Sequence, residues 1–157
     1  MHVAKRLKNV PIVVGYCSVN NLKVPEKVII HSDGASRGNP GKAAIGVIIQ
    51  DESGNILRIV SRFIGVTTNN QAEYKALIAG LEEAAALGAS EVVIFVDSEL
   101  VVMQIKGRYR VKKPQLVPLY LRAGELLAGF KSYTIEHVPR SLNGPADRLA
   151  NLALDKH

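Results

Sequence analysis

The chain contains little cysteine, no low-complexity tract and no long apolar run. Its single cysteine is Cys17, which excludes an internal disulfide and favours a reducing, cytoplasmic setting. No apolar stretch approaches the roughly 20 residues that a membrane-spanning helix needs, so no membrane association is expected. At 157 residues the chain is long enough to form one folded domain, and its hydrophobic content of 47% is sufficient for a buried core.

Acidic residues are scarce relative to basic ones. The chain carries 20 Lys and Arg against 14 Asp and Glu, a formal net charge of +6. This excess indicates a polyanionic partner such as nucleic acid, although a solvated basic surface would have the same composition. Residues 1–25 contain no acid and are treated as a basic N-terminal extension, of uncertain order, to a domain that spans residues 26–157. A targeting peptide fits this extension poorly, since its apolar part is short and carries Pro11.

Hydrophobic periodicity from residue 27 onward predicts an α/β fold. Apolar runs of strand length occupy residues 27–33, 43–50, 55–66, 91–97 and 131–138. Segments typical of helices occupy residues 69–87, 98–106, 116–128 and 143–155. The stretch Gly34–Gly41, rich in glycine, asparagine and proline, is predicted to be a turn. The order of elements predicts a five-stranded mixed sheet, three antiparallel strands and then two parallel ones, with helices on both faces.

Four acidic residues occupy positions where the hydrophobic pattern predicts buried side chains, and a charge is not expected there. They are Asp33, Glu73, Asp97 and Asp147. Two of them directly follow apolar runs that are typical of fully buried strands, and Glu73 and Asp147 share helical stripes with apolar residues. Like charges repel strongly at short range, so these carboxylates can lie close together only if a cation joins them. Oxygen ligands favour hard divalent ions, and the pattern therefore predicts a pair of such ions.

The segments that contain these acids resemble the ordered signatures of type 1 ribonuclease H. The matching blocks are Asp33-Gly-Ala-Ser-Arg-Gly-Asn-Pro-Gly41, Thr67-Thr-Asn-Asn-Gln-Ala-Glu73, Asp97-Ser98 and Asn143-Gly-Pro-Ala-Asp147. The resemblance extends from Lys27 to the C-terminus, and the short connection after residue 106 is similar to handle-free archaeal and some bacterial members. It implies a ribonuclease H-like fold and an endonuclease that cuts RNA within an RNA–DNA hybrid, leaving 5′-phosphate and 3′-hydroxyl ends.

The resemblance also implies a role for each acid. Asp33 would bridge two magnesium ions, with manganese as a substitute. Glu73 and Asp97 would hold the ion near the leaving group, and Asp147 would hold the ion that carries the attacking water. Two such ions can activate water and neutralise the departing oxyanion. Arg140 takes the place of an auxiliary histidine found in many bacterial members, and is expected either to steer phosphate during catalysis or to be an ordinary loop residue.

Further residues are predicted to contact the substrate. Backbone groups of Gly34, Ala35 and Ser36 are expected to meet ribose 2′-hydroxyls, the groups that distinguish RNA from DNA. Matches to the family suggest that Asn39 and Asn70 contact the minor groove and that Thr68 grips a DNA phosphate. Gln71, Ser98 and Asn143 complete the predicted set. For several of these residues a local role in a turn or helix cap is the alternative.

Two other functions are compatible with parts of this pattern. One is a module that binds hybrids without cutting them, which the presence of all four acids disfavours. The other is a nuclease of the same fold that acts on other duplexes, such as double-stranded RNA. A monomer with no obligate protein partner is expected in each case.

Overall fold

The computed structural model describes residues 12–13 and 25–157. The predicted N-terminal extension, residues 1–25, therefore lies outside the described residues except for Ile12, Val13 and Pro25. The predicted boundary at residue 26 stays a prediction.

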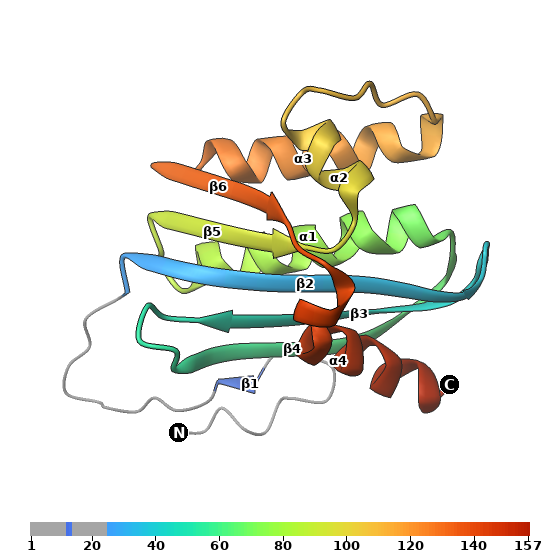
Figure 1. The fold of residues 1–157 in the computed structure, drawn as a ribbon, viewed down its shortest axis with the longest axis horizontal. Coiled ribbons are helices and arrows are strands. Elements are labelled where there is room, and N and C mark those ends of the chain that lie inside the picture. Colours follow the sequence, from blue (N-terminus) through green and yellow to red (C-terminus); the bar gives the residue numbers. More distant parts are fainter. Residues whose placement is uncertain (1–11, 14–24) are drawn as a thin grey trace.

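The described residues form one mixed sheet with the strand order β1-β4-β3-β2-β5-β6 (Figure 1). Its strands are β1 Ile12–Val13, β2 Lys27–Gly38, β3 Gly41–Gln50, β4 Ile56–Thr67, β5 Glu91–Val96 and β6 Ser132–His137. β3 runs antiparallel to β2 and to β4, while β5 joins β2 in parallel and β6 joins β5 in parallel. The predicted five-stranded mixed sheet is confirmed, and the two-residue strand β1 extends it at the edge of β4.

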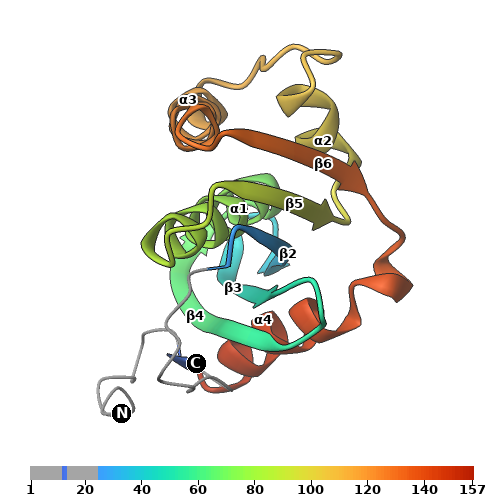
Figure 2. The ribbon, with the colours of Figure 1, turned by 90° about the vertical axis from the view of Figure 1, so that its left-hand side faces the viewer.

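Helices cover both faces of this sheet. They are α1 Asn69–Ala86, α2 Glu99–Ile105, α3 Val117–Ala128 and α4 Gly144–Asp155, with 3-10 turns at Pro114–Leu116 and Arg140–Leu142. α1 packs on β2 and β3, and α4 packs on the other side of the same strands (Figure 2). The whole stretch 43–49 of β3 is buried, because a strand between two layers of helix has no face toward solvent. None of the described helices has both the length and the apolar character that crossing a membrane requires.

One apolar stripe of α1 explains how a carboxylate enters the interior. Leu77, Leu81 and Ala84 are fully buried and pack in the main core. Glu73 lies one helical turn before Leu77 on the same stripe and is only 5% exposed. Residues four apart share one face of a helix, so the packing that buries the leucines also directs Glu73 inward.

The prediction of a turn over Gly34–Gly41 is wrong in its extent. β2 continues through Gly38 and pairs with β3 as far as Gly38 and Gly41, so the turn consists of Asn39 and Pro40. Gly38 has a φ of 111°, a conformation that favours glycine. The other turn-forming residues are held extended by pairing with β3, which overrides their local preference. The remaining predicted elements differ from the observed ones by one or two residues at either end.

Candidate functional site

Asp33 and Asp97 are brought together by the parallel pairing of β2 and β5. The last paired residues of these strands are Ser32 and Val96, and each acid follows directly. Because parallel strands run in the same direction, the residues after their last pair meet at the same edge of the sheet. Asp33 remains part of β2, where it lies opposite Gly46 of β3. The prediction that two apolar runs deliver their acids to one place agrees with this register.

Glu73 joins these two acids because α1 approaches β2 very closely at Gly34. A Cβ atom on Gly34 would lie 2.2 Å from the carbonyl carbon of Ala72, so any side chain there would separate helix and strand. The Gly34 amide donates a hydrogen bond to Glu73 Oε1 at 3.2 Å. One carboxyl oxygen each of Asp33, Glu73 and Asp97 lies within 4.8 Å of the others. Three segments that are distant in sequence thus converge on one buried carboxylate cluster.

Asp147 lies beside this cluster, in the first turn of α4. Gly46 permits α4 to approach β3, since a Cβ there would lie 2.1 Å from the Ala146 carbonyl oxygen. Asp147 interacts with the Asp33 carboxyl group, but it does not belong to the set of three acids within 4.8 Å. Its Oδ1 accepts hydrogen bonds from Arg140 Nη2 and from Asn151 Nδ2, both at 3.3 Å. The structure therefore places the fourth acid next to the three others, with a cation attached to it.

Asp33 and Glu73 have raised pKa values in this cluster. Burial is the main cause that raises the pKa of Asp33 well above its usual range, and the charges of Glu73, Asp97 and Asp147 add to it. Burial also raises the pKa of Glu73, as does the charge of Asp97, while the hydrogen bond from Gly34 opposes the shift. A cation bound between Asp33 and Glu73 would offset the repulsion that raises these two pKa values. The cluster's buried, oxygen-only donors fit a hard divalent ion.

Several predicted substrate residues line the same pocket as the acids. This pocket has a volume of about 380 Å³ and contains Asp33, Glu73 and Asp97. Its other walls include Gly34, Ala35, Ser36, Ser98 and Arg140. These five positions are therefore brought together with the acids, as the sequence predicts.

Thr68 and Gln71 form the cap of α1. The Thr68 hydroxyl accepts a hydrogen bond from the Gln71 amide, and Gln71 Oε1 accepts from the Thr68 amide at 3.0 Å. Asn39 joins this arrangement from the β2–β3 turn, because its Oδ1 accepts a hydrogen bond from the Asn69 amide at 3.0 Å. The local role considered for these residues is thus present in the structure, and their contact with substrate stays a prediction.

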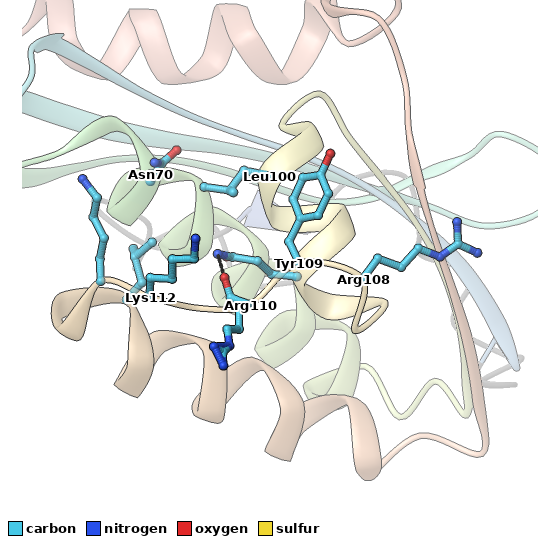
Figure 3. Close-up of a pocket in the computed structure, with 9 residues that line it drawn as sticks. Asn70, Leu100, Arg108, Tyr109, Arg110 and Lys112 are labelled. Atoms are coloured by element: carbon cyan, nitrogen blue, oxygen red, sulfur yellow. Dashed lines mark hydrogen bonds between the residues drawn. The ribbon is translucent and has the colours of Figure 1, made fainter.

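Asn143 and Asn70 are not among the residues that line the acid pocket. Asn143 is 0% exposed, and its Nδ2 donates to the Ser32 carbonyl at 2.9 Å. Asn143 thus links β2 to the start of α4, and its contact with substrate stays a prediction. Asn70 borders a different pocket, of about 580 Å³, beside the basic loop 106–113 (Figure 3).

Sequence reasoning did not identify three further polar residues that line the acid pocket. Arg37 forms an ion pair with Asp155 at 2.6 Å, Asn69 follows the cap residue of α1, and Asn151 donates to Asp147. A signal for Asn151 was available, since it lies four residues after Asp147 and so shares its face of α4. The pairing of Arg37 with Asp155 depends on where α4 crosses the sheet, which local sequence does not reveal.

Comparison with known proteins agrees with this fold. The sequence profile of the family described as "Reverse transcriptase-like" matches residues 31–153. The chain is 48% identical over 130 residues to the bifunctional protein Rv2228c of Mycobacterium tuberculosis, covering 82% of this chain and 36% of that protein. It is 48% identical over 129 residues to ribonuclease HI of Halobacterium salinarum, covering 82% of this chain and 65% of that protein. The chain thus spans about a third of the length of the mycobacterial relative.

A similar solved structure is that of LC11-RNase H1 in complex with an RNA/DNA hybrid. It superposes with a TM-score of 0.79 at 44% sequence identity, covering 82% of this chain and 97% of that chain. The similarity therefore includes nearly the whole of the other domain.

Proposed function

This chain belongs to the ribonuclease H family, and on that premise we propose that it hydrolyses the RNA strand of RNA–DNA hybrids, leaving 5′-phosphate and 3′-hydroxyl ends. The observation that carries the proposal is the convergence of Asp33, Glu73 and Asp97, whose carboxyl oxygens lie within 4.8 Å of one another. Asp33 and Glu73 are buried beside the half-buried Asp97, and like charges placed this close destabilise a fold unless a cation offsets their repulsion. The relative LC11-RNase H1, solved with a hybrid, supports the choice of substrate.

Magnesium is the proposed metal, as two ions per site, with manganese as a substitute. Asp33, Glu73 and Asp97 would hold one ion, and Asp33 with the neighbouring Asp147 would hold the other. Divalent ions bound there would supply Lewis acidity toward the attacking water and the leaving oxygen. Magnesium fits because it accepts few protein oxygens and keeps coordination positions for water and substrate phosphate.

The chain's own residues would bind and orient the scissile strand. The backbone of Gly34, Ala35 and Ser36 lines the pocket beside the acids, within reach of ribose hydroxyls on a strand that lies there. Ser98, at the start of α2, is a further wall of that pocket. Thr68, Gln71 and Asn39 are proposed to act at its rim, through the cap of α1 to which all three belong.

Arg140 is proposed to contact the scissile phosphate. Its side chain is 74% exposed and is held by Asp147 at 3.3 Å, so the guanidinium lies at the mouth of the pocket. The hydrogen bond that Arg140 donates to Asp147 is the main cause that raises the pKa of Arg140 further. A group that stays charged cannot shuttle a proton, so its contribution would be electrostatic, toward the negative charge of the phosphate.

Arg140→Ala is expected to lower kcat by about 100-fold or more with little change in KM, by analogy with removal of one donor to a transition-state anion. The melting temperature should not change appreciably, because the side chain is largely exposed. Arg140→Lys should restore part of kcat, since a lysine keeps the charge and loses the forked geometry. Steady-state cleavage of a labelled hybrid measures both constants. Wild-type kcat in Arg140→Ala would make Arg140 an ordinary loop residue.

The proposed function is tested with one labelled RNA, presented paired with DNA, paired with RNA, or alone, each with magnesium or with a chelator. We expect the RNA to be cleaved only when it is paired with DNA, and only when magnesium is present. Binding of the hybrid without cleavage would identify a binding module instead. Equal cleavage of the RNA duplex would identify a broader nuclease of the same fold.

The domain is further proposed to act as a monomer in the cytoplasm. The lone Cys17 and the basic composition are the features that support this setting. Light scattering of the purified full chain, with and without a short hybrid, measures the oligomeric state. A dimer in both conditions would contradict the proposal.

A further inference from the structure

A basic loop follows α2 and ends at the 3-10 turn Pro114–Leu116. Gly107 has a φ of 79° and closes the helix, and the amide of Arg108 donates to the Met103 carbonyl at 2.8 Å. The loop contains five basic residues in eight positions: Lys106, Arg108, Arg110, Lys112 and Lys113. Lys106 pairs with Glu136 at 3.4 Å, whereas the other four have no acidic partner among the residues that the structure describes. An uncompensated set of cations on a short loop is suited to a polyanion.

Two buried polar side chains connect this loop to the core. Tyr74 of α1 is 0% exposed, and its hydroxyl donates to Oε1 of Gln104 at 2.7 Å. Gln104 of α2 is 3% exposed, and its Nε2 donates to the Arg110 carbonyl oxygen at 3.3 Å (Figure 3). A carbonyl can only accept, so the nitrogen of the Gln104 amide must face Arg110 and its oxygen must face Tyr74. The two hydrogen bonds therefore form one chain with a fixed direction.

Each link of this chain is costly to break. A buried amide or hydroxyl that loses its partner keeps the full penalty of desolvation, so Gln104 is held in one orientation by Tyr74. Burial raises the pKa of the Tyr74 hydroxyl, which therefore stays a donor at any physiological pH. Gln104 is in turn hydrogen-bonded to the middle of the loop, at the Arg110 carbonyl oxygen.

The loop lies next to the acid pocket. Its own pocket, of about 580 Å³, is bordered by Asn70 of α1 and Leu100 of α2. Their near neighbours Asn69 and Ser98 line the acid pocket. Tyr74 also directly follows Glu73, so one turn of α1 holds both a carboxylate of the site and the support of the loop. In Figure 3 the side chains of Arg108, Tyr109 and Arg110 extend from the loop in different directions.

We propose that Tyr74 and Gln104 are positioning residues that hold the basic loop 106–113 at a fixed distance from the acids, so that its cations meet the phosphates of a bound duplex. The proposal rests on the proposed function for the identity of the duplex. It assigns neither residue a contact with substrate. Their role is to fix the loop before binding, so that little ordering is needed when the duplex arrives.

Gln104→Met tests the link, because methionine has a similar length and volume but forms neither hydrogen bond. Backbone amides of residues 106–113 are expected to exchange hydrogen faster. KM, and Kd measured with a chelator, should rise about tenfold while kcat changes less than about twofold. The slope of log Kd against log salt should become shallower by about 2, the equivalent of roughly two lost phosphate contacts.

Stability is separated from positioning by a second pair of variants. Tyr74→Phe leaves the Gln104 oxygen unpaired and removes the bond that orients the Gln104 amide, so it should lower the melting temperature and raise Kd, although less than Gln104→Met does because the bond to Arg110 can still form. Tyr74→Phe combined with Gln104→Met removes both polar partners, which should recover melting temperature but not affinity. Ile49→Val, a core change on β3 away from the loop, is the control and should leave Kd unchanged. Affinity that follows melting temperature across these variants would overturn the proposal.

A double-mutant cycle checks that the loop mediates the effect. Lys112→Gln with Lys113→Gln should weaken binding in the wild-type background and have much less effect in Gln104→Met, because the freed loop no longer presents these charges. Additive effects would overturn the proposal. If the wild-type protein bound the hybrid but did not cut it, the proposed function would be refuted, while the Kd values of the variants would still test the positioning role. A cutting enzyme with unaltered Kd in Gln104→Met would refute only the positioning role.

Discussion

Asp33→Asn is expected to abolish cleavage and, without metal, to raise the melting temperature. The loss of cleavage should be about a thousandfold or more, because the change removes the carboxylate proposed to hold both ions and so several kcal/mol of transition-state stabilisation. The gain in stability follows from the 4% exposure of Asp33 and the three neighbouring acids that raise its pKa. Relief of about 1–2 kcal/mol corresponds to roughly 3–6 °C for a chain of this length.

The pH dependence of this gain has a definite sign. A carboxyl group whose pKa is raised by folding binds more protons in the folded state than in the unfolded state, so wild-type stability falls as pH rises above the ordinary carboxyl range near about 4. The difference in melting temperature between Asp33→Asn and wild type should therefore be small near pH 4 and grow toward neutral pH. Scanning calorimetry with a chelator measures it. Added magnesium should reverse the order, because it stabilises only the protein that binds it.

Asp51→Asn is the matched control. Asp51 accepts hydrogen bonds from the amides of Ser53 and Asn55, both at 2.9 Å, in a hairpin loop outside the acid pocket. The same chemical change there removes a favourable charge, so stability should fall slightly and cleavage should stay at the wild-type level. A rise in melting temperature for both variants would show that the repulsion among the clustered acids is not the cause.

Gly46→Ala is expected to destabilise the fold and to remove most activity. The new Cβ would lie 2.1 Å from the Ala146 carbonyl oxygen and 2.7 Å from the Ala150 amide nitrogen. Backbone atoms can move away only if α4 shifts as a whole, which should cost about 3 kcal/mol or more. Asp147 would move with the helix, so cleavage should fall further than the loss of folded protein explains. Urea unfolding and single-turnover cleavage measure the two effects separately.

Gly124→Ala provides the comparison for this glycine. Gly124 is exposed on α3, and a Cβ there meets no atom within 4 Å. Alanine is favoured over glycine inside a helix by about 0.5–1 kcal/mol, so this variant should be more stable than the wild type. If both alanine variants gained stability, the close approach of β3 and α4 would not hold in solution.

Local hydrophobic periodicity explains why the sheet and the positions of the acids could be predicted from the sequence. Unbroken apolar runs identify central strands, so the sequence places Asp33 and Asp97 at strand ends, and the parallel pairing of β2 with β5 then brings the two acids together. The helical stripe of Leu77 and Leu81 likewise directs Glu73 inward. Such patterns are local, and local periodicity is what a single sequence reveals.

Partners of polar side chains could not be predicted in the same way. The sequence does not reveal that the buried Asn143 side chain bonds to the Ser32 carbonyl, more than a hundred residues away in the chain. Gln104 was not singled out, although it links α1, α2 and the basic loop. An amide can bond to backbone, side chain or ligand, and only the packing of distant elements decides among them. The turn at Gly34–Gly41 was overestimated for a related reason, since pairing with β3 extends β2 through it.

The length of β2 has a consequence for recognition. β2 continues to Gly38, whereas its parallel neighbour β5 ends at Val96, opposite Ser32. Within the described residues no strand pairs with that side of β2 beyond Ser32, and the Gly34 amide there is taken up by Glu73. Backbone amides alternate along a strand, so the Ser36 amide points to the same side as that of Gly34. The sheet thus offers a short unfilled row of peptide groups inside the pocket, whose spacing is set by the backbone and cannot be altered by exchanging side chains.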